Sequence, residues 1–265
     1  MKPAPFEYAA PRSLDEALGL LGEDAKPLAG GQSLVPLLNF RLARPELLVD
    51  INGLSELARL RRDDGALRIG ALTRQSALGR SELVAAEWPL LTHAVRFVGH
   101  PQIRNRGTVG GSVAHADPAA ELPVALAALD ARFVAQSPRG RRMLRAEELF
   151  LGPLTTALEP DELLVEIEVP PVPEGAGSAF VEHARTAGDF AIAGAAALVS
   201  GSGHAAIALL GARPTPVRAP DAERALVDGA EPREAAALAA SSVEGGHRRA
   251  LVAELVRRAI EEAVP

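Results

Sequence analysis

The chain contains no cysteine among its 265 residues. A disulfide, a thiolate zinc site and a cysteine nucleophile are therefore excluded. An iron–sulfur cluster held in the usual way needs cysteine thiolates as ligands. Any such cluster would have to lie on another chain.

Lysine is also nearly missing: Lys2 and Lys26 are the only two, and arginine supplies the remaining positive side chains. The formal net charge is -6, whereas nucleic-acid binding needs a basic excess to neutralise phosphates. We therefore expect no nucleic-acid partner.

Long apolar runs are absent as well, so we expect no transmembrane segment. The first residues, MKPAPFEYAAPRSLDE, lack the apolar stretch of a signal peptide, and we expect a cytoplasmic protein. Neither GxGxxG nor GxxxxGKS/T occurs. A Rossmann nucleotide site and a P-loop are thus unsupported.

What the sequence does contain is two glycine pairs with polar neighbours. Gly110 and Gly111 stand between Thr108 and Ser112, and an alanine-rich helix is expected from about Ala119. Glycine lets backbone N–H groups surround an anion because no Cβ intervenes. The positive end of that helix would point back to the same loop. These features predict a phosphate-binding loop, with an ordinary tight turn as the alternative.

The other pair, Gly30 and Gly31, is followed by Gln32 and Ser33 and then by an apolar helical run from Leu34. Each pair thus lies between a strand-like run and the start of a helix. Two such loops fit one pyrophosphate that is bound from both sides.

At these residues a family resemblance becomes specific. The segments KPLAGGQSLVPLLNFRLARPELLVDI and VGHPQIRNRGTVGGSVAHADPAAELP resemble the two flavin-binding segments of one protein family. That family is the FAD-binding medium subunit of molybdenum hydroxylases, of the carbon monoxide dehydrogenase and xanthine dehydrogenase type. The resemblance covers essentially the whole chain. It implies an FAD-binding domain of the vanillyl-alcohol-oxidase (PCMH-like) type, built from two α/β subdomains.

The resemblance also implies which residues contact the cofactor, while no residue of this chain is expected to be catalytic or to bind a metal. The expected cofactor-binding residues are Leu28, Ala29, Gly30, Gly31, Gln32, Ser33, Leu34, Thr108, Val109, Gly110, Gly111, Ser112, Glu121, Leu164 and Phe190. Glu121 would contact the ribose or adenine half of FAD, cap its own helix, or do both. Phe190 would either lie near the isoalloxazine or pack in the core. Some family members carry a lysine beside the strand that precedes Phe190, where this chain has Val181, Glu182 and His183 and no lysine.

Four polar residues near Gly110 have two interpretations each. His115 and Asp117 invite a metal or acid–base role, but with no third ligand nearby a hydrogen-bonded pair that fixes the loop is favoured. Arg104 and Arg106 either face the diphosphate or a partner subunit, or belong to the solvated surface.

The expected fold is α+β in two domains. Residues 1–172 are expected to form the FAD-binding domain, whose last strand covers residues 163–169 and is followed by a proline-rich break. Residues 173–265 are expected to form a small C-terminal domain with a three-stranded sheet and two amphipathic helices. Its strands are expected at residues 179–184, 193–200 and 205–210.

The resemblance implies one subunit of a heterotrimer. A small partner would carry [2Fe-2S] clusters, and a large partner would carry the molybdenum cofactor at which the substrate is oxidised. This chain would receive electrons from the clusters and pass them through FAD to an external acceptor, which could be NAD, a quinone or oxygen. Two alternatives stay open: a free-standing FAD-dependent oxidoreductase, and a flavin-free scaffold or regulatory subunit.

Overall fold

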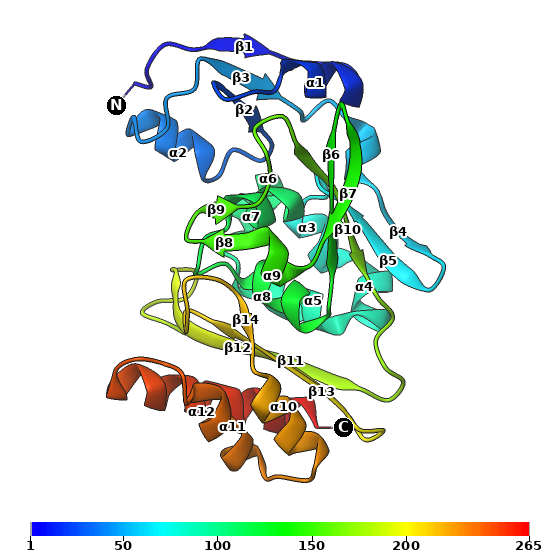
Figure 1. The fold of residues 1–265 in the computed structure, drawn as a ribbon, viewed down its shortest axis with the longest axis vertical. Coiled ribbons are helices and arrows are strands. Elements are labelled where there is room, and N and C mark those ends of the chain that lie inside the picture. The colour runs from blue at the N-terminus through cyan, green and yellow to red at the C-terminus, as the bar shows by residue number, and fades with distance from the viewer. Residues whose placement is uncertain (1, 265) are drawn as a thin grey trace.

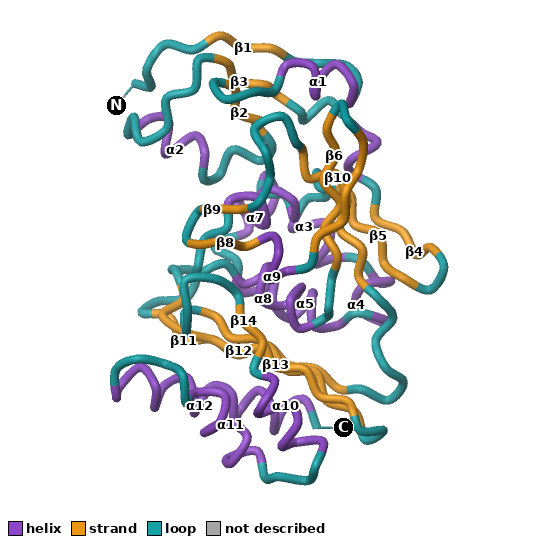
Figure 2. Tube along the Cα trace, viewed as in Figure 1, coloured by secondary structure: helices purple, strands orange, loops and turns teal. Residues whose placement is uncertain are grey.

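The computed structural model describes residues 2–264. Its elements form three parts that follow one another along the long axis of the molecule (Figure 1). A small N-terminal sheet lies at one end, a five-stranded sheet with helices lies in the middle, and a four-stranded sheet with three helices lies at the other end. Helices and strands are both abundant in each part (Figure 2), which confirms the predicted α+β class. No helix within residues 2–264 combines the length and apolarity required to cross a membrane.

The N-terminal part carries the first glycine pair on the loop between its second strand and second helix. Its elements are β1 (Glu7–Ala9), α1 (Leu14–Leu20), β2 (Ala25–Leu28), α2 (Leu34–Asn39) and β3 (Leu47–Asp50). The strands pair in parallel in the order β1-β3-β2. Ser13 begins α1, because its hydroxyl accepts a hydrogen bond from the Glu16 N–H.

The middle part is a five-stranded antiparallel sheet covered by helices, with strand order β4-β5-β10-β6-β7. Its elements are η1 (Ser55–Ala58), β4 (Leu60–Asp63), β5 (Ala66–Gly70), α3 (Gln75–Arg80), α4 (Glu82–Glu87), α5 (Pro89–Phe97), α6 (Pro101–Arg106), α7 (Val109–His115), α8 (Glu121–Ala128), β6 (Arg132–Ser137), β7 (Gly140–Leu144), α9 (Ala146–Leu149), β8 (Phe150–Gly152), β9 (Thr155–Thr156) and β10 (Leu163–Val169). The bounds of β10 are those predicted from the sequence.

The structure corrects the prediction of a loop at the second glycine pair. Gly110 and Gly111 lie in the first turn of α7. Glycine disfavours a helix, but Thr108 caps this one, since its hydroxyl accepts a hydrogen bond from the Gly111 N–H at 3.0 Å. The helix ends at Ala116, whose φ of 52° is left-handed. The helix expected to follow begins only at Glu121, as α8.

The C-terminal part is a four-stranded antiparallel sheet with helices on one face. Its elements are β11 (Gly177–Ala184), β12 (Ala191–Ser200), β13 (His204–Leu210), β14 (Val217–Arg218), α10 (Pro220–Val227), α11 (Pro232–Ala240) and α12 (Gly246–Ala263). The three predicted strands are present. The prediction of only three was wrong, because the two-residue β14 pairs with β13. The helix α10 was also not predicted.

The sheet of the C-terminal part lies between two apolar layers. Ala193, Ala195 and Ala197 of β12 face α10, α11 and α12, whereas Ala196 and Leu198 face the helices of the middle part. The main core therefore continues across residue 172. The division into two domains at that residue stays a prediction.

Candidate functional site

The two glycine segments lie against each other, as the sequence predicts for a single binding site. A Cβ placed on Gly30 would collide with the carbonyl oxygen of Arg106 and lie 2.8 Å from the Cα of Gly107. A Cβ on Gly111 would lie 3.8 Å from the Cβ of Ala29. The loop between β2 and α2 thus packs on the backbone that leads from α6 into α7 (Figure 1).

The first glycine segment is an open loop with unused donors. The backbone N–H groups of Gly30, Gly31, Gln32 and Ser33 have no acceptor within residues 2–264. Gly31 has a φ of +72°, which favours glycine, and the Gln32 side-chain amide donates to the Gly30 carbonyl at 3.2 Å. Backbone donors require a partner. Four successive free N–H groups therefore fit an anion such as a pyrophosphate.

The second glycine segment differs, because its N–H groups are already paired. Val109 N–H donates to the Thr73 carbonyl and Gly110 N–H to the Ala71 carbonyl, both at 2.9 Å. Gly111 N–H donates to the Thr108 hydroxyl. The expectation of free amides on this side was wrong. The hydroxyl of Ser112, which has no partner within the described residues, is the free polar group here.

The close packing of Gly110 explains why a glycine stands there. A Cβ at this position would lie 2.5 Å from the Cβ of Ala71 and 2.7 Å from its Cα. Carbon atoms that are not bonded to each other do not approach this closely in proteins. Gly110 thus lets the start of α7 pack directly on the chain that leaves β5.

The apolar residues expected at the cofactor are divided between the loop and the core. Leu28, Ala29 and Leu34 are half-buried around the first glycine loop. Val109 is fully buried and Leu164 is 5% exposed, both within the main core. The structure does not bring the Leu164 side chain to the surface of the glycine segments. Its assignment to the cofactor stays a prediction.

Two residues that the sequence patterns did not single out connect the glycine segments. The side-chain amide of Asn52 donates to the Ala29 carbonyl at 2.7 Å and to the Leu28 carbonyl at 3.2 Å. Arg74 donates from one nitrogen to the Asn52 side-chain oxygen at 2.7 Å and from another to the Arg106 carbonyl. The only sequence signal was that Asn52 precedes a glycine at the end of a strand.

Glu121 stands in the first turn of α8, as predicted, and is only 7% exposed. Burial raises the pKa of Glu121 to about 8, and the nearby carboxylates of Glu182 and Asp117 act in the same direction. Burial also raises the pKa of Glu182 to about 7, and one of its carboxylate oxygens is buried without a hydrogen-bond partner in the part of the chain that the structure describes. The middle and C-terminal parts therefore meet at one buried acid, Glu121, and one half-buried acid, Glu182, which fit hydroxyl donors of a ligand.

The other polar residues near the second segment have structural roles. One nitrogen of Arg104 donates to the carbonyls of Val98 and Gly99, at 2.8 and 2.9 Å, and so fixes the turn before α6. Asp117 accepts a hydrogen bond from the Ala119 N–H at 2.8 Å. Residues 2–264 contain no group of three acidic or histidine side chains that could hold a metal ion.

Phe190 lies on the connection between β11 and β12 and is 72% exposed. Packing in the core, one of the two interpretations, is therefore excluded. The same connection touches the middle part, since a Cβ on Gly188 would lie 2.6 Å from the His100 ring. A contact between Phe190 and the isoalloxazine stays a prediction.

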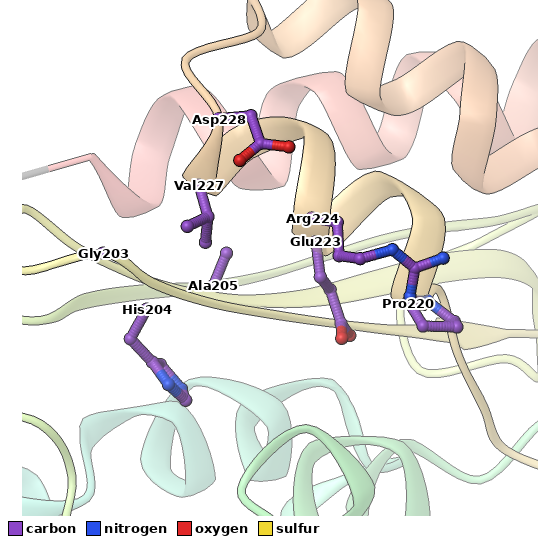
Figure 3. Close-up of a pocket in the computed structure, with 8 residues that line it drawn as sticks. All are labelled: Gly203, His204, Ala205, Pro220, Glu223, Arg224, Val227 and Asp228. Atoms are coloured by element: carbon purple, nitrogen blue, oxygen red, sulfur yellow. The ribbon is translucent and has the colours of Figure 1, made fainter.

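A pocket of about 330 Å³ lies elsewhere, on the C-terminal part between β13 and α10. Figure 3 shows that His204 points to the side of the strand opposite Arg224 and Asp228. Glu223 is engaged as an acceptor by Arg218 and the Ile207 N–H. The polar side chains of this pocket do not converge on one point, so the glycine segments are the better candidate site.

Comparison with known proteins shows which family this chain resembles. A family model described as the FAD binding domain in molybdopterin dehydrogenase matches residues 4–172. The 6-hydroxypseudooxynicotine dehydrogenase complex subunit alpha of Paenarthrobacter nicotinovorans is 48% identical, over 92% of this chain and 86% of its own length. The carbon monoxide dehydrogenase medium chain of Hydrogenophaga pseudoflava is 39% identical, over 99% of this chain and 98% of its own. The structure resembles a chain of reconstituted CO dehydrogenase from Oligotropha carboxidovorans, with a TM-score of 0.95 at 37% identity over 100% of this chain and 99% of that one.

Proposed function

The chain belongs to the family of FAD-binding medium subunits of molybdenum-dependent dehydrogenases, and on that premise we propose how it works in a complex. It carries FAD and serves electron transfer. FAD can hold one or two electrons, and so it links one-electron carriers to two-electron acceptors. The protein contributes binding, orientation and the electrostatic environment.

The free N–H groups of residues 30–33 are the observation that carries the assignment of the site. They would hold the pyrophosphate of FAD, with the hydroxyls of Thr108 and Ser112 on the opposite side. Glu121 would accept a hydrogen bond from a hydroxyl of the ribose half. Residues 1–172 would form the FAD-binding domain and residues 173–265 the C-terminal domain, a division supported by the family match over residues 4–172.

The proposed partners are a small subunit with [2Fe-2S] clusters and a large subunit with the molybdenum cofactor, in a heterotrimer. The lack of cysteine supports this arrangement, because the cluster ligands must come from another chain. Several relatives are named as subunits or medium chains of larger enzymes. Electrons would enter from the clusters and leave through FAD to an external acceptor.

The test is to purify the chain alone and with its co-expressed partners. We expect flavin absorbance in the chain alone, release of FAD on denaturation, and no oxidation of substrate without partners. A chain with no flavin, and with no FAD binding on titration, would make it a scaffold. Substrate oxidation by the isolated chain at the rate of a complex would make it a free-standing enzyme.

A further inference from the structure

The hydrogen bonds between Asn52 and Arg74 occupy a particular place in the fold. Asn52 belongs to the first glycine segment, because its amide donates to two carbonyls at the end of β2, those of Leu28 and Ala29. The same amide donates to the side chain of Asp50 at 2.7 Å. The hydroxyl of Tyr8 in turn donates to Asp50 at 2.6 Å. Asn52 is thus held in one orientation by its own neighbours.

Arg74 belongs to the second glycine segment. Its backbone forms an isolated antiparallel bridge with Thr108. The neighbouring Gln75 N–H donates to the Gly107 carbonyl at 2.9 Å, and the Val109 N–H donates to the Thr73 carbonyl at 2.9 Å. The backbone around Arg74 therefore moves together with the start of α7.

The guanidinium of Arg74 joins these two units. One nitrogen donates to the side-chain oxygen of Asn52, and the other donates to the carbonyl of Arg106. The Arg106 carbonyl is also the atom that Gly30 approaches too closely to allow a Cβ. The carbonyl oxygen of Arg106 thus accepts the hydrogen bond from Arg74 and also makes the close backbone contact with Gly30.

We propose that Asn52 and Arg74 are positioning residues, which set the separation of the two glycine segments and thereby the affinity for FAD without touching it. This inference rests on the proposed function, that the segments bind the FAD pyrophosphate. Donors held in place before binding avoid an ordering cost at the moment of binding. The two side chains suit this task, because the planar guanidinium offers fixed donors on two sides, and the carboxamide of Asn52 offers donors on one side and an acceptor on the other.

The experiment is to titrate the full-length apoprotein with FAD and to measure thermal unfolding of the same apoprotein. Arg74→Met removes both donors, and Asn52→Ala removes the amide. We expect each to weaken FAD binding about 10- to 100-fold. The double variant should bind no more weakly than the worse single variant, because both changes break the same connection. Arg139→Met is the matched control, since the exposed Arg139 pairs with Asp161 and not with the glycine segments. Apoprotein unfolding should shift no more in the Asn52 and Arg74 variants than in this control.

Arg74→Lys separates the effect of positioning from the effect of charge. It also tests the inference if Arg74→Met does not fold. Lysine keeps the positive charge but cannot donate to both acceptors with a planar fork, so we expect FAD affinity to fall at least threefold. Parent-like affinity in Arg74→Lys or in Asn52→Ala, or strictly additive losses in the double variant, would overturn the inference. Failure of the parent itself to bind FAD would instead refute the proposed function.

Discussion

The two glycine pairs share a composition and differ in conformation. Gly30 and Gly31 lie in an open loop whose N–H groups are free. Gly110 and Gly111 lie in a capped helical turn whose N–H groups are all paired. The first pair thus offers donors and, at Gly30, also permits close contact with the Arg106 backbone, while the second permits close backbone contact alone. A glycine pair in a sequence indicates where a side chain is absent, and the hydrogen bonds around it decide whether it also offers free donors.

The largest effect should follow from Gly110→Val. The new side chain would overlap Ala71 on the neighbouring backbone, so α7 cannot keep its place. We expect a loss of about 3 kcal/mol or more in the free energy of unfolding, measured by denaturant titration of the apoprotein. Gly19→Ala in α1, where nothing lies within 4 Å, is the control and should stabilise slightly. A stable Gly110→Val that lost only flavin would place this glycine with the first pair.

Gly30→Ala should act on binding more than on folding. Its methyl group would push the first loop away from the Arg106 carbonyl, and a loop can yield to this more easily than a helix can. We expect FAD affinity to fall about 100-fold, or about 2.7 kcal/mol, measured by FAD titration. Gly22→Ala, which meets nothing within 4 Å, should bind normally. Equal affinity in both variants would show that the contact between the segments is irrelevant to the cofactor.

The free energy of unfolding should depend on pH through Glu121. This prediction extends the comparison from the N–H donors of the glycine pairs to a carboxyl group that can accept hydrogen bonds. Burial raises the pKa of Glu121 from 4.5 to about 8. Between pH 4.5 and about 8 the folded chain therefore retains a proton that the unfolded chain releases. The free energy of unfolding thus falls as the pH rises through this range. Between pH 5 and 8, Glu121→Gln should reduce this fall in the free energy of unfolding by on the order of 2 kcal/mol. The measurement is apoprotein unfolding at several pH values.

Glu147→Gln is the control for this series, since Glu147 is an exposed carboxylate on α9. It should leave the pH dependence unchanged. A decline of equal slope in Glu121→Gln and in the parent would show that the folded chain does not raise the pKa of Glu121.

The smallest effect on stability should follow from Phe190→Ala, outside both glycine segments. Because the ring is 72% exposed, unfolding should change by no more than about 0.5 kcal/mol. If the ring covers the flavin, oxygen should reoxidise the reduced flavin faster in the variant complex, as stopped-flow absorbance would record. Leu151→Ala removes another exposed apolar side chain and should change neither property. Unchanged reoxidation in Phe190→Ala would mean that another element restricts access.

The sequence predicted those elements whose signals are local. Strand β10 was predicted residue by residue, because LLVEIEV is a mainly apolar run that alternates with glutamate in its second half and that a proline pair ends. The turn between β4 and β5 also follows from a local signal, since Asp64 and Gly65 have φ values of 48° and 78°, as that dipeptide favours. The helix at Gly110 was missed, since its stability comes from the Thr108 cap and from the packing on Ala71.

The connection through Asn52 and Arg74 could not be predicted for a related reason. The carbonyls that Asn52 contacts lie 23 and 24 positions earlier in the chain, and the carbonyl that Arg74 contacts lies 32 positions later. No local pattern contains these separations. The burial of Glu121 and Glu182 also depends on the contact between the middle and C-terminal parts.

The alanine-rich sheet between the two apolar layers has a mechanical consequence. A hinge motion that swung the C-terminal part away would expose Ala196, Leu198 and the small side chains beside them to water, on the face of β12 and β13 that packs against the middle part. Such opening costs free energy in proportion to the area exposed. Separation of the C-terminal part from the middle part is therefore opposed by this buried apolar face.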